Sequence, residues 1–266
     1  MLNRFARLVV AAVAAILIAL APAAHAQGGS LQGYGVVLLH GKLFWPGAFV
    51  GGLIAALRAE GAQVATPEMP WSRVRMYDAT YEQAMREIDT AVAGLKAQGA
   101  TKIVVAGHSM GANAAIGYAA RHGGGLTAVM AFSPGHLPET AEMREYTRDA
   151  IARAKALVAA GKGEEPARFP DRAQGWPYYV TATPEAYLSL FDPDGPAAMP
   201  KNAAAMPAVP FLWLVGRSDP IHSRGPGYAY ERAAKHPLSR YLEVDAGHIG
   251  APNAAQNEIV AWLKSL

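Results

Sequence analysis

Short, nearly continuous apolar runs alternate along the chain with longer segments of helical period. The apolar runs lie near residues 35–40, 62–66, 102–107, 126–133, 210–216 and 240–245. Each is too short for a typical helix. The runs near 35–40, 102–107, 126–133 and 210–216 are almost entirely apolar, which is the pattern of a strand buried on both faces, whereas 62–66 and 240–245 also carry polar residues. The sequence therefore predicts about six strands.

Five intervening segments have helical character: residues 48–60, 80–98, 110–122, 224–235 and 252–265. The clearest is 80–98, where apolar residues recur every three or four positions and Gly99 follows as a stop signal. Strands that alternate with helices form parallel sheets with right-handed crossovers. We expect an α/β fold with a minimal, mostly parallel sheet of about six strands flanked by helices.

About seventy residues separate the strand that ends near Ser133 from the strand that begins near Pro210. Connections in compact domains are usually only a few residues long, so this surplus predicts an insertion that covers the core. Residues 138–160 have helical composition, and a second short helix is expected to begin at Thr183. We predict a core of residues 27–135 and 207–266 with a helical cap at residues 136–206.

The first 26 residues have the composition of a secretory signal peptide. Arg4 and Arg7 precede an apolar stretch, Leu8 to Leu20, and Ala24-His25-Ala26 is a small-x-small cleavage site. We expect cleavage after Ala26, no stable membrane insertion afterwards, and a periplasmic or secreted protein. The sequence contains no cysteine, which rules out disulfides, a thiol nucleophile and cysteine-bearing zinc sites.

The charge distribution argues against nucleic acid as a partner. The formal net charge is +3, but without Arg4 and Arg7 the 24 basic residues become 22, against 21 acidic residues. No basic stripe or cluster runs along the chain, so nucleic acid is not an expected partner. A small molecule is the expected ligand, and the sequence does not indicate an oligomeric state.

Polar residues with catalytic potential follow four of the predicted strands. Gly107-His108-Ser109-Met110-Gly111 comes directly after one strand and before an alanine-rich helix, the pattern of a tight turn that exposes Ser109. Asp219 follows the run at 210–216, and His248 follows the run at 240–245. His40-Gly41 ends the first run, where a backbone N–H can contribute to an oxyanion hole. A serine, an aspartate, a histidine and a backbone N–H donor at the ends of these strands predict catalysis by a serine nucleophile.

On these residues the chain resembles the serine hydrolases of the α/β-hydrolase superfamily, from about Gly35 to the C-terminus. The order serine, aspartate, histidine is that of this superfamily. The resemblance implies a catalytic triad of Ser109, Asp219 and His248. It also implies an oxyanion hole formed by the backbone N–H groups of Met110 and Lys42, with Leu43 as the alternative to Lys42.

Each role has rivals in the sequence. Asp245, Asp192 and Asp194 are other candidates for the triad acid, and His222 is the main alternative to His248. The remaining histidines lack partners at the spacing of metal ligands, so no metal site is expected. No cofactor is expected either.

Aromatic and apolar residues suggest the substrate pocket. The residues that we expect to line it are Leu43, Phe44, Trp45, His108, Trp176, Tyr179 and Tyr187. The simplest reaction for this set is cleavage of carboxylic esters through an acyl-enzyme on Ser109. Amide or peptide cleavage, acyl transfer or perhydrolysis with the same triad is one alternative, and a non-catalytic periplasmic binding protein on the same fold is another.

Overall fold

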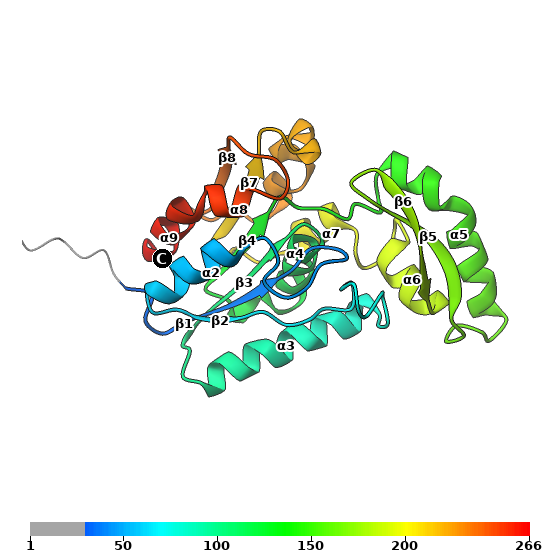
Figure 1. The fold of residues 1–266 in the computed structure, drawn as a ribbon, viewed down its shortest axis with the longest axis horizontal. Helices are drawn as coiled ribbons and strands as arrows, with labels where there is room; N and C mark the ends of the chain where they lie inside the picture. The colour runs from blue at the N-terminus through cyan, green and yellow to red at the C-terminus, as the bar shows by residue number, and fades with distance from the viewer. Residues whose placement is uncertain (1–29) are drawn as a thin grey trace, which may run out of the picture. The chain divides into compact units, whose positions relative to one another are not determined.

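The computed structural model describes residues 30–266, and its core is a six-stranded sheet (Figure 1). The predicted signal peptide, residues 1–26, lies outside the described residues. The strands run in the spatial order β2-β1-β3-β4-β7-β8, and each neighbouring pair is parallel. Their bounds are β1 Tyr34–Leu39, β2 Gln63–Ala65, β3 Lys102–His108, β4 Ala128–Phe132, β7 Phe211–Gly216 and β8 Arg240–Val244. The six predicted strands and their parallel arrangement are confirmed.

Helices cover both faces of this sheet, which explains why the central strands are apolar at consecutive positions. On one face lie α2 (Gly51–Ala59), α8 (Ala251–Ala254) and α9 (Gln256–Lys264). On the other lie α3 (Tyr81–Ala97) and α4 (Met110–His122), with α7 (Met199–Ala205) packed against α4. Side chains along β1 alternate between the two faces: Val36 and Leu38 pack toward α2, α8 and α9, and Val37 and Leu39 pack toward α3 and α4.

Local signals set the helix ends where the sequence predicted them. Thr80 caps α3 by accepting a hydrogen bond from the Gln83 N–H, and the Gln83 side chain accepts one from the Thr80 N–H. Gly99, with a φ of 90°, follows the helix in the left-handed conformation that ends many helices. Burial of its apolar stripe against the sheet then supplies most of the helix's stability.

The segment predicted as a helical cap also contains a β-hairpin. It holds α5 (Ala141–Ala159), β5 (Ala167–Ala173), β6 (Trp176–Ala182) and α6 (Pro184–Phe191), and β5 pairs antiparallel with β6. The two cap helices predicted near residues 138–160 and from Thr183 are present as α5 and α6, but the sequence did not predict the hairpin between them. Gln174 and Gly175 both have positive φ, 49° and 86°, and they form the two-residue turn that suits a twisted hairpin.

A second difference concerns residues 224–235, which the pattern predicted as a helix. The structure has three short 3₁₀ segments here: Pro220–Arg224 (η2), Pro226–Tyr228 (η3) and Tyr230–Arg232 (η4). Gly225 has a φ of 64°, and Pro226 removes a backbone donor, so a continuous α-helix cannot form. Within residues 30–266, no helix combines the length and the hydropathy required to span a bilayer.

Candidate active site

Ser109 occupies a strained turn between β3 and α4. Its φ of 56° and ψ of −118° lie outside the regions that non-glycine residues usually adopt. The flanking glycines make the turn possible: a Cβ on Gly107 would lie 2.1 Å from the Gly111 carbonyl oxygen, and one on Gly111 would lie 2.4 Å from the Leu39 oxygen. The strain is typical of a residue that the fold holds in an exposed position for chemistry.

Asp219 and His248 meet at the ends of β7 and β8. His248 Nδ1 donates a hydrogen bond of 2.9 Å to Asp219 Oδ2, while Asp219 Oδ1 accepts one of 3.1 Å from the Ile221 N–H. Burial by itself would raise the pKa of Asp219, but the hydrogen bonds from His248 and Ile221 outweigh it and hold the pKa below its ordinary value. The carboxylate therefore stays charged and orients the imidazole.

The rival residues are paired elsewhere. Asp245 forms an ion pair with Arg217, Asp192 with Lys155, Asp194 with Arg144, and His222 contacts Glu243. Only Asp219 among the candidate acids hydrogen-bonds His248 within the part of the chain that the structure describes.

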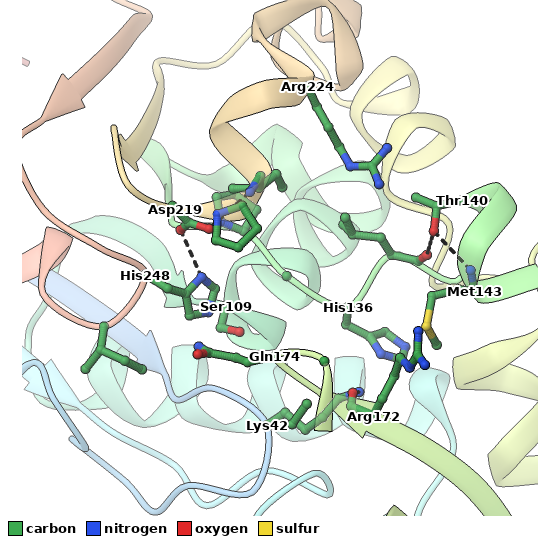
Figure 2. Close-up of a pocket in the computed structure, with 18 of the residues that line it drawn as sticks. Lys42, Ser109, His136, Thr140, Met143, Arg172, Gln174, Asp219, Arg224 and His248 are labelled. Atoms are coloured by element: carbon green, nitrogen blue, oxygen red, sulfur yellow. Dashed lines mark hydrogen bonds and ion pairs between the residues drawn. The ribbon is translucent and has the colours of Figure 1, made fainter. Parts of the chain in front are cut away.

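Ser109 and His248 lie beside one another on the wall of a single cavity (Figure 2). The Ser109 hydroxyl faces Gly135, where an added Cβ would lie 2.7 Å from Oγ, and it makes no hydrogen bond to His248 among the described residues. A turn about χ1 gives the hydroxyl a second staggered direction. Catalytic hydrogen bonds are commonly loose without substrate and tighten in the complex.

His108, predicted to contact substrate, is instead buried and supports His248. It is 1% exposed, and its Nε2–H donates to the His248 carbonyl oxygen at 2.8 Å. The placement of His108 in the substrate pocket is corrected: the residue directly before Ser109 points back into the protein and does not line the cavity. Burial, reinforced by the nearby His248, lowers the pKa of His108 to about 4.

This burial makes the free energy of unfolding depend on pH. Below about pH 6.5 the unfolded chain protonates His108 while the folded chain does not, so acid favours unfolding. We expect this residue to remove about 2 kcal/mol of stability between pH 7 and pH 5. Urea unfolding of wild type and His108→Gln at both pH values measures it; an equal pH dependence in the two proteins would contradict the prediction.

Two backbone N–H groups beside Ser109 are unused. Among the described residues, neither the Met110 nor the Lys42 N–H donates to a protein acceptor, whereas the Leu43 N–H is bonded to the Trp71 carbonyl at 2.9 Å. Leu43 is therefore not available as an oxyanion donor, which favours Lys42 over that alternative. His40 fixes this turn by accepting a hydrogen bond of 3.0 Å from the Met69 N–H.

A buried ion pair joins the cap hairpin to the same turn. Lys42 Nζ lies 2.7 Å from Asp171 Oδ1, with side-chain exposures of 9% and 0%. The other carboxylate oxygen accepts hydrogen bonds from the hydroxyls of Tyr77 and Tyr178. Oδ1 also accepts a hydrogen bond of 2.7 Å from the Arg172 N–H. Both oxygens of the buried Asp171 thus have two donors each, so the pair can hold β5 against the core.

The cavity around Ser109 has a volume of about 480 Å³ and lies between core and cap. Its apolar walls come mainly from residues that follow the strand ends and from the start of α5: Phe44, Phe49, Pro134, Leu137, Met143, Ile221 and Ile249. Gln174, at the tip of the hairpin, reaches across it toward Ser109 (Figure 2). Phe44 is the one predicted pocket aromatic that lines it.

The other predicted pocket residues lie elsewhere. Tyr187 is fully buried and stacked between Phe169 and Phe191 in the cap. Trp45, Trp176 and Tyr179 are exposed outside the cavity, and Leu43 does not line it. Their placement in the pocket is corrected, because cap aromatics here pack the insertion or face solvent. Position after a strand end would have been the better signal, since it identifies Pro134, Gly135 and Ile221.

The family follows from comparison with known proteins. A model of the alpha/beta hydrolase family matches residues 36–261. The chain belongs to this family. No curated protein sequence is similar enough to the chain to count as a match.

Solved structures of alpha/beta hydrolases are similar in fold at low sequence identity. A monoacylglycerol lipase from Paleococcus ferrophilus has a TM-score of 0.62 and 23% identity, with coverage of 87% of this chain and 94% of the lipase. An esterase from Pyrococcus furiosus has a TM-score of 0.58 and 19% identity, covering 90% and 84%. A thermophilic esterase from Thermogutta terrifontis has a TM-score of 0.53 and 19% identity, covering 88% and 89%. The shared architecture extends over nearly all of each chain.

Proposed function

We propose that this alpha/beta hydrolase is a serine hydrolase that cleaves carboxylic esters through an acyl-enzyme on Ser109. The observation that carries the proposal is the hydrogen bond from His248 to the buried, charged Asp219, on a cavity wall shared with the strained Ser109. The fold neighbours named as esterases and lipases support the same reaction class.

The proposed reaction begins when Ser109 Oγ attacks the ester carbonyl carbon. His248 Nε2 accepts the serine proton, and Asp219 stabilises the imidazolium that results. The backbone N–H groups of Met110 and Lys42 donate to the oxygen that becomes negative in the tetrahedral intermediate. His248 then returns the proton to the leaving alcohol, and a water molecule, deprotonated by His248, releases the acid from Ser109.

Labelling with a fluorophosphonate tests the nucleophile directly. We expect one covalent phosphonyl adduct, located on Ser109 by mass spectrometry, since only a serine activated by its neighbours displaces fluoride at a useful rate. Denatured protein is the control for unassisted reactivity. A folded protein that stays unmodified would favour the alternative of a non-catalytic binding protein.

The reaction class is tested with matched substrates. We expect kcat/KM for 4-nitrophenyl esters of short and medium acids to exceed that for the corresponding 4-nitroanilides, because an amide requires more acid assistance to its leaving group. Faster turnover of the anilides would assign the triad to amide cleavage. Product analysis with added alcohol or hydrogen peroxide distinguishes acyl transfer and perhydrolysis from hydrolysis.

A further inference from the structure

One charged side chain on the cavity wall lacks an opposite charge. Five charged residues line the cavity, and four of them have partners: Lys42 with Asp171, Arg172 with Glu142, and Asp219 with His248. Arg224 forms no salt bridge with any residue that the structure describes. The cavity therefore presents one exposed cation that has no ion-pair partner among the described residues.

Local packing holds the Arg224 guanidinium at this wall. Its central carbon lies 5.3 Å from the centre of the Tyr228 ring, and the Tyr228 hydroxyl is hydrogen-bonded to Glu139. Stacking on a ring uses the face of the guanidinium and leaves the N–H donors at its edge free for a planar carboxylate. The side chain is thus partly ordered before any ligand arrives.

The nearby carboxyl of Glu139 does not take the place of a ligand. Burial raises its pKa above the ordinary value, and its oxygen accepts the Tyr228 hydroxyl rather than an Arg224 N–H. Glu142, the other acidic group on this side, is 2.7 Å from Arg172. Glu142 is therefore committed to Arg172, and Glu139, which does not line the cavity, interacts with Arg224 only through its charge and not through an ion pair or hydrogen bond.

Arg224 and Ser109 lie on different sides of the cavity. Figure 2 shows the Arg224 guanidinium projecting from its loop toward Thr140, while Ser109 and His248 lie at the opposite wall. Apolar groups of Pro134, Leu137 and Ile221 also line the cavity. A ligand that reaches from the nucleophile to the cation thus requires an apolar segment followed by an anion.

We infer that the substrate is an ester carrying a carboxylate, separated from the ester by an apolar segment, and that Arg224 binds this carboxylate. The inference rests on the proposed ester hydrolysis and adds the class of ester. A carboxylate bound equally in the ground and transition states lowers KM more than it raises kcat.

Matched ester pairs test the charge alone. With the charge on the acid side, mono-4-nitrophenyl adipate is compared with 4-nitrophenyl hexanoate; on the alcohol side, 6-acetoxyhexanoate is compared with hexyl acetate. Wild type is expected to prefer the anionic member of one pair in kcat/KM. Arg224→Gln should lower that preference by about tenfold, mainly through KM, and added salt should weaken it.

Two further variants distinguish binding of the carboxylate at Arg224 from a general effect of the protein's net charge. Arg240→Gln removes the same charge at the exposed start of β8, outside the cavity, and should leave the preference unchanged. Arg224→Glu should make the neutral ester the better substrate. An anionic-to-neutral ratio that is the same in wild type, Arg224→Gln and Arg224→Glu would overturn the inference while leaving ester hydrolysis intact.

A binding measurement tests the carboxylate site at Arg224 independently of the proposed ester hydrolysis. Calorimetry with Ser109→Ala and monohexyl adipate should show binding that Arg224→Gln weakens by about tenfold, independently of turnover. Arg224-dependent binding without hydrolysis by wild type would leave the carboxylate site standing and overturn the proposed reaction. Equal affinity of Ser109→Ala and of the double variant Ser109→Ala with Arg224→Gln for monohexyl adipate would overturn the carboxylate site.

Discussion

Replacing Ser109 with alanine should lower kcat for ester hydrolysis by about four orders of magnitude or more, because Ser109 is the proposed nucleophile and no other serine among the described residues lines the cavity. The free energy of unfolding should change by less than about 1 kcal/mol, since the hydroxyl faces the cavity and makes no hydrogen bond to the described residues. Steady-state kinetics and urea unfolding measure the two quantities on the same preparations.

Ser218→Ala provides the matched control. Ser218 is an exposed serine next to Asp219 but does not line the cavity, so its replacement should leave kcat within about twofold. Activity of Ser109→Ala comparable to that of Ser218→Ala would remove Ser109 from the mechanism. Loss of folding in both variants would appear directly in the unfolding curves.

The sheet could be predicted from the sequence because a strand that is buried on both faces has apolar residues at consecutive positions. Runs such as Phe211–Gly216 have no polar position to serve a solvent face, so their type and limits are visible without a structure. The glycines of the nucleophile turn are similarly informative, since backbone atoms fill the space that a Cβ would occupy. Steric requirements at these positions leave few alternatives.

The cap was harder because its local sequence and its conformation disagree. Pro170, Asp171 and Pro177 are disfavoured in strands, yet they lie in β5 and β6. Asp171 is held there by Lys42, Tyr77 and Tyr178, contacts that no local pattern reveals. The pocket lining was mispredicted for the same reason, since it depends on how the cap docks onto the core.

Some features of the candidate site could be predicted from the sequence, and others required the structure. The order of Ser109, Asp219 and His248 along the chain pointed to their strand ends, but their distances required the fold. The choice between Lys42 and Leu43 as an N–H donor could not be made from sequence, because it depends on the hydrogen bond from Leu43 to Trp71. Arg224 was missed because it lies in a segment that was predicted to be helical.

Replacing Asp171 with asparagine should lower the free energy of unfolding by about 3–5 kcal/mol, the usual cost of leaving one charge of a buried ion pair without its partner. The variant keeps the shape of the side chain but leaves the Lys42 ammonium, 9% exposed, beside a neutral amide. Guanidinium unfolding followed by tryptophan fluorescence measures the loss. Arg144→Gln, which breaks the exposed pair with Asp194, should cost far less, because water screens that pair.

The double variant Lys42→Met with Asp171→Asn separates an unpaired charge from a general defect of packing. Removing both charges should recover part of the stability lost in Asp171→Asn, because a buried pair is costly chiefly when only one partner remains. Since Lys42 also carries a proposed oxyanion N–H, the single variant should lower kcat more than it raises KM. A cost for Asp171→Asn no larger than that for Arg144→Gln would show that the Lys42–Asp171 pair does not hold the cap hairpin to the core.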